Sequence, residues 1–347
     1  MRGSLSSAQT KIYNRRLNIF QDTSMNQMVN KSNSLSAMLD AKAWLQERVI
    51  GQEKLIDRLI ISLITGGHLL VEGAPGLAKT RAIKELSTLI QGDFHRIQFT
   101  PDLLPSDVTG TEVYRPEDGT FIFQKGPIFH NLVLADEINR APAKVQSALL
   151  EAMGENQVSF GRKTFELPNL FFVMATQNPI EQEGTYPLPE AQLDRFIMKV
   201  LVEYPDHQNE SNILKLVREE NISTPSSAPL TISQEQLLNA RKELLSLHME
   251  ESIEKYVVGL IMATREPSGS VSEWIEYGSS PRGTISLDQC ARSIAWLSDR
   301  DFVTPEDVQN IIHDVMRHRL ILTFEAESQG ITANQVIDEI VRTVPVP

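Results

Sequence analysis

Apolar residues follow two kinds of pattern along the chain, and each kind predicts a different element. Between residues 35 and 64 they recur every three to four positions, which is the spacing of amphipathic helices. Five short runs then follow that are apolar on both faces, as expected for strands of a buried parallel sheet. The runs are 68–72, 94–99, 131–135, 170–176 and 196–201. Because helical patterns or long connections separate them, an α/β domain is predicted.

Two of the connections carry the pattern of β-hairpins. In 111–125, alternating apolar residues flank the turn sequence PEDG, and in 156–167 they flank the turn sequence GRK. We therefore expect two hairpins that project from the sheet.

Composition divides the chain into four segments. Residues 1–34 are rich in Ser, Asn, Gln, Lys and Arg and begin with MRGS, so we expect a disordered or vector-derived leader. Residues 35–220 hold the α/β domain, and a Ser-, Thr- and Pro-rich linker at 221–230 follows it. In 231–347 the apolar patterns are helical, so an all-helical second domain is predicted.

Composition and charge also exclude or disfavour several classes of function. The 33 basic and 45 acidic residues give a net charge of −12, which disfavours non-specific binding to nucleic acid or an anionic membrane. The single cysteine, Cys290, excludes an intrachain disulfide and a cysteine-rich zinc site. Since no run of about 18 apolar residues is present, no transmembrane helix is expected. We therefore expect a cytoplasmic protein.

The first predicted strand leads into GAPGLAKT at 73–80 and then into a helix. This is a phosphate-binding loop pattern in which Ala78 replaces the second glycine, and it remains compatible if the φ angle of Ala78 is negative. Tight turns at glycine let successive N–H groups point at one phosphate, and the helix N-terminus adds a positive dipole end. The expected nucleotide-binding residues of the loop are Gly73, Ala74, Pro75, Gly76, Leu77, Ala78, Lys79 and Thr80.

Two side chains of this loop have distinct chemical roles. Lys79 supplies a mobile positive charge for the β- and γ-phosphates. Thr80 offers a hydroxyl to Mg²⁺. The loop therefore predicts ATP and Mg²⁺ as the bound species.

Polar residues end two of the later strands. Asp136 and Glu137 follow the apolar run at 131–135, at the strand end where ligands bind in parallel sheets. Asp136 would hold Mg²⁺, and Glu137 would orient and deprotonate the attacking water. Asn178, after the run at 170–176, could hydrogen-bond the γ-phosphate or this water. The alternatives are a helix-capping acidic pair and an Asn-Pro turn.

Three arginines are candidates for stabilising charge on a transferring phosphoryl group. Arg195 stands directly before the last strand, and its alternatives are an ion pair with Asp194 or exposure to solvent. Arg282 lies at a helix start, where the dipole disfavours a cation unless a phosphate is near. Arg140 closely follows the acids, and the sequence does not decide whether it or Arg195 acts on a neighbouring subunit.

The motifs, taken in order, resemble those of MoxR-type AAA+ ATPases over about residues 35–345. They are VIGQ at 49–52, GAPGLAKT at 73–80, LVLADEINRAP at 132–142, ATQNP at 175–179, LPEAQLDRF at 188–196 and SPRGTISL at 280–287. The family's own loop has the form GxPGxAKT. The resemblance implies a sheet of order 5-1-4-3-2, hairpins of the helix-2-insert and pre-sensor-1 classes, and a helical lid.

The resemblance also implies roles for individual residues. Lys79 and Thr80 match Walker A, and Asp136 and Glu137 match Walker B. Asn178 matches sensor 1.

The resemblance also assigns the family's arginine roles and its adenine pocket to residues of this sequence. Arg195 matches the arginine finger that reaches a neighbouring subunit. Arg282 matches sensor 2, expected over the phosphates of an ATP bound between core and lid. Val49 and Ile50 would line the adenine pocket.

The implied function is a hexameric, chaperone-like ATPase that remodels or matures protein complexes, with a von Willebrand factor A domain protein as partner. One alternative is a chelatase-type motor subunit for metal insertion, which a tetrapyrrole-handling partner would stimulate. A DNA-acting AAA+ ring is disfavoured by the net charge of −12 and by the absence of a helix-turn-helix pattern. A non-catalytic, nucleotide-gated scaffold would bind nucleotide without releasing phosphate. The sequence does not identify the client.

Overall fold

The computed structural model describes residues 33–347, except 118, 162, 180–183, 223–227 and 229–230. The leader expected at 1–34 lies outside the described residues, apart from its last two positions. Those two begin a helix that runs to residue 48, so the folded chain starts earlier than expected. Among the described residues, no helix has both the length and the apolar composition needed to cross a membrane.

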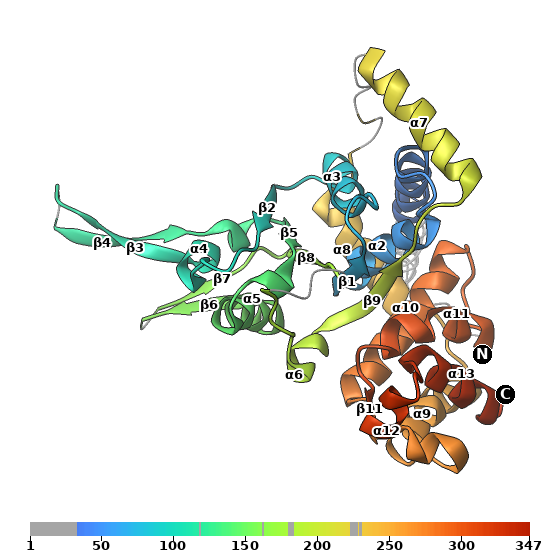
Figure 1. Ribbon diagram of the computed structural model, residues 1–347. Helices are drawn as coiled ribbons and strands as arrows, with labels where there is room; N and C mark the ends of the chain where they lie inside the picture. Colours follow the sequence, from blue (N-terminus) through green and yellow to red (C-terminus); the bar gives the residue numbers. More distant parts are fainter. Residues whose placement is uncertain (1–32, 118, 162, 180–183, 223–227, 229–230) are drawn as a thin grey trace, which may run out of the picture.

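Five parallel strands form the central sheet, in the spatial order β2-β5-β8-β1-β9 (Figure 1). They are β1 (His68–Gly73), β2 (Phe94–Gln98), β5 (Leu132–Asp136), β8 (Phe172–Gln177) and β9 (Phe196–Val202). Numbered among themselves along the chain, these strands have the order 5-1-4-3-2 from the β9 edge. The five predicted strands and their order are therefore confirmed.

Helices cover both faces of this sheet, which explains why the strands are apolar on both faces. Alternate residues of β1 enter different cores: Leu69 and Val71 join one cluster, and Leu70 joins the other. The first cluster includes apolar residues of α2 (Glu53–Thr65) and α3 (Lys79–Leu89), and the second those of α5 (Ala143–Glu155). Because the strands are parallel, their carboxyl ends lie together along one side of the sheet, where a ligand site can form.

Both predicted hairpins are present and lie together. They are β3 (Gly110–Arg115) with β4 (Thr120–Lys125), and β6 (Gln157–Phe160) with β7 (Lys163–Glu166). Phe123 of β4 stacks on Phe165 of β7, with ring centroids 4.2 Å apart and planes at 16°. Tyr114 and Phe121 pair farther along β3–β4 and are 52% and 60% exposed. Figure 1 shows the hairpins extending from the sheet on the side away from the C-terminal helices.

Short elements complete the core. They are α4 (Pro105–Thr109), η1 (Pro127–Phe129), η2 (Ile138–Arg140) and α6 (Glu190–Leu193), with the longer α7 (His207–Ile222) after β9. Helix α7 extends two residues into the linker predicted at 221–230, and most of that linker lies outside the described residues.

The second region is helical, as predicted, with one addition. Its helices are α8 (Gln234–Leu245), α9 (Glu251–Arg265), η3 (Gly269–Glu273), α10 (Pro281–Leu297), α11 (Pro305–Met316), α12 (Phe324–Ser328) and α13 (Ala333–Thr343). The addition is an antiparallel pair of short strands, β10 (Ile275–Tyr277) and β11 (Ile321–Leu322), which the helical periodicity did not indicate. Thr304 caps α11 through a capping box with Asp307.

Buried ion pairs fix this helical region to the core. Arg58 of α2 donates to Asp314 of α11 at 2.8 Å, and Arg317 donates to the other carboxylate oxygen of Asp314 at 2.7 Å. Burial by itself raises the pKa of Asp314, but Arg58, Arg317 and Lys54 outweigh burial, so the pKa is lowered. Asp314 is therefore held as a charged anchor between the two regions.

Candidate active site

The loop between β1 and α3 has the backbone of a phosphate cradle, with one residue in an unusual conformation. Ala78 has a φ of 56°, in the left-handed region, so the condition of a negative φ is not met. An alanine there is strained by about 1–2 kcal/mol because its Cβ approaches the following carbonyl. Gly73 is required for a different reason, since a Cβ would lie 2.8 Å from the Val202 carbonyl oxygen of β9.

Lys79 lies inside this loop and is 9% exposed. Its ammonium donates to the carbonyl oxygens of Gly73 and, at 3.0 Å, Ala74. Burial lowers the pKa of Lys79, while the negative charges of Asp136, Glu137 and Glu72 oppose that shift. The first two of these acids are the predicted Walker B pair, so the structure brings lysine and acids together. Thr80 follows Lys79 in the first turn of α3.

Asp136 ends β5 and is held on both carboxylate oxygens. Thr176 of β8 donates its hydroxyl to Oδ1 at 2.6 Å, and Arg96 of β2 donates to Oδ2 at 2.7 and 3.0 Å. The strand register explains these contacts, because β2 and β8 pair with β5 on its two sides. Sequence reasoning missed both partners. The sequence offered no clear signal for Arg96, because its strand also contains the polar residues His95 and Gln98.

Glu137 has a left-handed backbone, with a φ of 57°. Its carboxylate Oε2 accepts from Gln98 Nε2 at 2.9 Å and from Arg140 Nη1 at 3.0 Å. Arg140 therefore contacts the acid of its own chain. Strained residues of this kind often occur where function fixes the backbone. Asn178 is buried just past β8, at the same edge of the sheet as the two acids.

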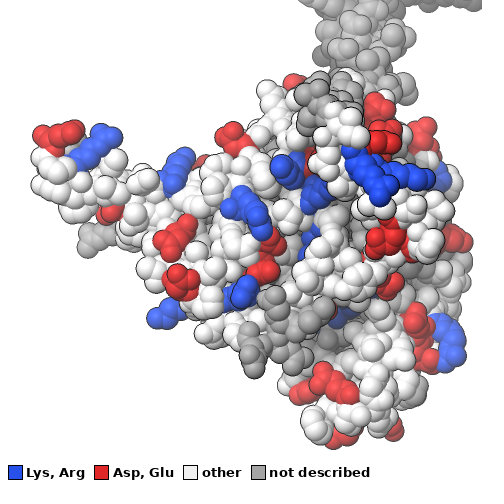
Figure 2. Space-filling model, turned by 45° about the horizontal axis from the view of Figure 1, so that its top comes forward, with Lys and Arg blue, Asp and Glu red and all other residues white. Residues whose placement is uncertain are grey.

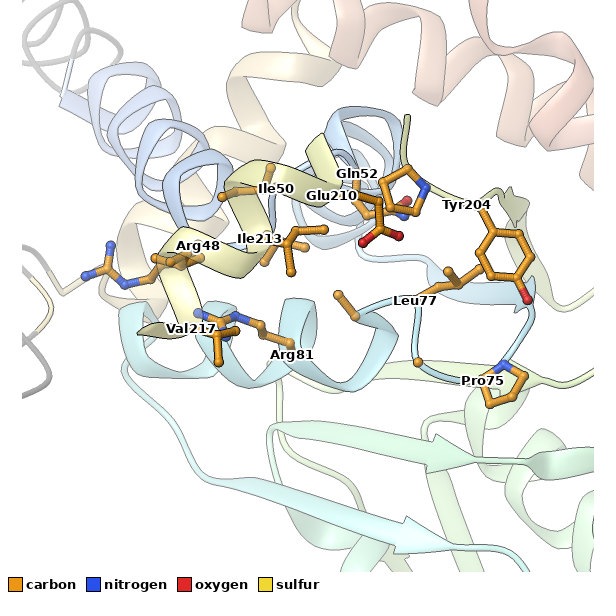
Figure 3. Close-up of a pocket in the computed structure, with 15 residues that line it drawn as sticks. Arg48, Ile50, Gln52, Pro75, Leu77, Arg81, Tyr204, Glu210, Ile213 and Val217 are labelled. Carbon is orange, nitrogen blue, oxygen red and sulfur yellow. The ribbon is translucent and has the colours of Figure 1, made fainter. Parts of the chain in front are cut away.

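A pocket of about 220 Å³ opens beside the loop. Val49 and Ile50 line it, as expected for the base site, and so do Pro75 and the residues to Ala78. Its other wall is α7, which contributes the apolar residues Ile213, Leu216 and Val217. Figure 3 shows α7 crossing above α3, with Val217 beside Arg81 of that helix. Helix α7, and not the C-terminal helical region, therefore encloses this pocket.

An ion pair joins α7 to α3 at this pocket. Arg81 of α3 donates through both terminal nitrogens to the carboxylate of Glu220, one contact at 3.0 Å. Both partners are partly exposed, and the hydrogen bond with Glu220 raises the pKa of Arg81. The sequence gave no basis for this pairing because the residues are 139 positions apart.

Arg282 lies elsewhere, which corrects the expectation that the lid brings it over the phosphates. It lines a second pocket, of about 250 Å³, together with Arg195, Arg319 and residues 66–68. Residues 66–68 precede or begin β1, whereas the phosphate loop follows that strand. Six residues of strand rise about 3.3 Å each, so roughly 17–20 Å of β1 separates the two places. The physical reason is that α10 packs against α2 and β9.

Charges of both signs cover the outer surface. On the face shown in Figure 2, basic and acidic side chains of the described residues are interspersed, without a broad basic area. This arrangement agrees with the net charge of −12.

A parallel sheet of this order, with a phosphate loop after β1 and paired acids at the end of β5 on the other side of β8, defines a P-loop nucleotide-binding protein of the AAA class. Residues 68–198 match the family model described as ATPase family associated with various cellular activities, and residues 270–340 match the AAA lid domain.

Similarity to individual proteins shows which family within this class the chain belongs to. The chain is 45% identical over 303 residues to chaperone MoxR1 of Mycobacterium tuberculosis, covering 86% of this chain and 79% of MoxR1. It is 43% identical over 300 residues to the uncharacterized protein YeaC of Bacillus subtilis, covering 86% and 91% of the two chains. A crystal structure of a candidate ATPase from Cytophaga hutchinsonii superposes with a TM-score of 0.84 at 44% identity, covering 94% of this chain and 99% of that one. The chain belongs to the MoxR family of AAA+ ATPases.

Proposed function

We propose that this protein binds ATP between the phosphate loop, residues 49–50 and α7, and hydrolyses it. The observation that carries the proposal is the convergence of Lys79, Asp136 and Glu137 at one edge of the sheet, with the charges of both acids acting on the lysine. The apolar walls of the neighbouring pocket suit a flat base. Thr80 and Asp136 offer the hydroxyl and carboxylate oxygens that Mg²⁺ prefers, and they would hold it there. Bound Mg²⁺ would neutralise charge on the β- and γ-phosphates.

The protein groups divide the work of hydrolysis. The N–H groups of the loop and Lys79 bind and orient the triphosphate. Glu137 orients the attacking water and accepts its proton, while Asn178 contacts the γ-phosphate or that water. Gln98 and Arg140 both engage Oε2 of Glu137, so they fix the direction in which its carboxylate faces.

Arg195 and Arg282 act on a neighbouring subunit in this proposal. They share a pocket at the far end of β1 from the chain's own phosphate loop, so neither can serve that loop in this conformation. A second copy, placed with its phosphate loop at this pocket, would receive both guanidiniums. AAA+ proteins generally form rings, and we propose a hexamer in which each site lies between two subunits. The division into a core at 35–220 and a lid at 231–347 belongs to this proposal.

The output, we infer, is mechanical work on a protein client in the cytoplasm. The hairpins would contact the client, since Tyr114 and Phe121 expose apolar surface where they project from the sheet. A von Willebrand factor A domain partner and a role in maturing protein complexes rest on the family resemblance. Mass spectrometry of proteins captured on an ATP-trapped ring would test both expectations.

The decisive experiment replaces the proposed base. Glu137→Gln keeps the size of the side chain but removes its basicity, so ATP binding should persist while phosphate release falls about 100-fold or more. Lys79→Ala is the matched control and should lose ATP binding itself. Phosphate release at the wild-type rate by Glu137→Gln would refute the assignment. Wild-type protein that binds ATP without any phosphate release would favour a nucleotide-gated scaffold instead.

A further inference from the structure

Arg319 is a buried arginine of the helical region, 7% exposed, just after α11. Its Nε donates to Asp194 Oδ1 at 2.9 Å, and its Nη2 donates to the carbonyl oxygens of Phe196 at 2.7 Å and Asp194 at 3.3 Å. These acceptors belong to the residues immediately before and after Arg195. One side chain of the lid therefore fixes the backbone on both sides of Arg195.

The guanidinium of Arg319 also contacts β9, α11 and α10. Nη1 donates to the carbonyl oxygens of Ile197, at 3.1 Å, and Val315, and Nη2 also reaches Ser286 of α10 at 3.2 Å. The guanidinium has five N–H groups in a rigid plane, so one N–H of Nη2 is shared between two of its three acceptors. A lysine ammonium has three donors and no fork, so it cannot reproduce the arrangement.

Asp194 extends this network to the second arginine. Its Oδ2 accepts from the Ser280 hydroxyl at 2.8 Å, and the same hydroxyl oxygen accepts from the backbone N–H of Arg282 at 3.1 Å. Ser280 is also the residue that caps α10. Asp194 thus pairs with Arg319 and Ser280, and the chain Arg319–Asp194–Ser280 connects the segments that carry Arg195 and Arg282.

The side chain of Arg195 has fewer constraints than its backbone. Its Nη1 donates to the Leu150 carbonyl oxygen, and among the described residues its Nε has no hydrogen-bond partner. The guanidinium lies over Gly154, where a Cβ would come within 3.0 Å of Nη1. Arg195 and Arg282 open to the same pocket. The backbone is therefore set while the guanidinium can still turn toward a phosphate.

We propose that Arg319 is a positioning residue that holds Arg195 and Arg282 at a fixed separation, so that both enter the neighbouring subunit's site as one unit. The inference rests on the proposed function, in which these two arginines act on the next subunit. It adds that the orientation of the lid determines whether the next subunit can hydrolyse ATP.

The first test compares two lid arginines. Arg319→Lys keeps the charge but loses the fork, so ATP affinity should be unchanged while kcat falls about 100-fold, less than the roughly 10³- to 10⁵-fold expected for outright loss of an arginine finger. Arg292→Lys is the matched control, because Arg292 is also partly buried and multiply bonded but contacts Asp288 and Leu247 within the lid. Both variants should lose thermal stability, and only Arg319→Lys should lose kcat. Wild-type kcat in Arg319→Lys, or equal kcat losses in both, would overturn the proposal.

The second test uses mixed rings to separate this proposal from the proposed function. Lys79→Ala subunits cannot bind ATP but carry intact arginines, so mixing them with Arg195→Ala subunits should restore turnover if the arginines act on neighbours. Mixing Lys79→Ala with Arg319→Lys subunits should restore turnover in the same way. Failure of the first mixture refutes the proposed function. Rescue of the first mixture without rescue of the second overturns the positioning role alone.

Two milder variants decide the question if Arg319→Lys does not fold. Ser280→Ala removes the connection between Asp194 and Arg282 together with the side-chain cap of α10, and Asp194→Asn weakens the connection to Arg319. Each should lower kcat without changing the KM for ATP, and each should be rescued in mixed rings with Lys79→Ala subunits. Unchanged kcat in both variants would overturn the proposal.

Discussion

The hydroxyl of Thr176 lies 2.6 Å from Asp136 Oδ1, and its oxygen also accepts the backbone N–H of Glu137 at 2.9 Å. One buried side chain of β8 therefore orders both acids at the end of β5. Both contacts are made between neighbouring strands of the sheet, so the positions of the acids are tied to the register of β5 and β8.

Thr176→Val should test this ordering, because valine keeps the shape of threonine but lacks its hydroxyl. We expect ATP binding within about twofold of wild type and a fall in kcat of about 10- to 100-fold, as acids lose their orientation. Steady-state phosphate release and nucleotide titration would measure both quantities. Thr65→Val, which removes a hydroxyl at the end of α2, is the control and should retain kcat. Normal kcat in Thr176→Val would show that the strand alone orients the acids.

Ala78→Gly should stabilise the protein, since glycine adopts the left-handed backbone of this position without strain. The free energy of unfolding should rise by about 1 kcal/mol, with ATP hydrolysis retained. Denaturant unfolding would measure it. The same substitution at Ala82, inside α3, should instead cost about 1 kcal/mol because glycine weakens a helix interior. A destabilised Ala78→Gly would mean that unfolded-state entropy exceeds the relief of strain.

The Arg81–Glu220 pair should contribute modestly to ATP affinity by holding α7 over the pocket. Both residues are partly exposed, so we expect Arg81→Glu to weaken binding no more than about fivefold at low salt. The double variant Arg81→Glu with Glu220→Arg should recover most of this loss, and added salt should shrink the difference. Equilibrium titration with a fluorescent nucleotide would measure affinity. If the double variant does not recover the ATP affinity lost in Arg81→Glu, Arg81 contacts the nucleotide directly.

Stability should depend on pH through His68. Burial lowers the pKa of His68 from 6.5 to about 4, with Met153 opposing and Arg241 adding to the shift. Because the folded pKa is the lower one, His68 contributes full stability above pH 6.5 and loses it as the pH falls toward 4. The loss amounts to at most about 3 kcal/mol.

Urea unfolding between pH 7.5 and 4.5 would measure this dependence. His68→Gln keeps polar atoms for Val173 and Met153 but does not titrate, so its stability should fall less steeply over this range. His207→Gln, at the exposed start of α7, should follow the wild-type curve. Parallel curves for His68→Gln and wild type would contradict the lowered pKa.

Local patterns were sufficient to predict the elements of the fold, whereas the order of the strands in the sheet came from the family resemblance. The five apolar runs, the two hairpin turns and the helical C-terminal region depend on periodicity and turn residues, which act over a few positions. The Walker-type residues could be predicted equally well, because the phosphate loop and the acids at 136–137 each occupy one continuous segment. The short β10–β11 pair escaped prediction because strands of two or three residues carry little periodic signal.

Relationships between distant segments could not be predicted in this way. The left-handed φ of Ala78 depends on the conformation of the whole loop. The position of α7 over the pocket depends on where the chain turns after β9. Arg282 was expected over the phosphates because its motif fixes its place on α10 but not the side of the core on which α10 packs. Arg319 carried only the weak signal of three successive basic residues at 317–319.

The stack of Phe123 on Phe165 has a mechanical consequence. Hairpin β3–β4 is inserted before β5, and β6–β7 is inserted after it, so the two excursions bracket the strand that ends in Asp136. A pull on the exposed tip of one hairpin is shared with the other through the two rings. The load then returns to the sheet on both sides of β5. In the proposed function, the force of a resisting polypeptide would therefore reach the two acids that are proposed to act in hydrolysis.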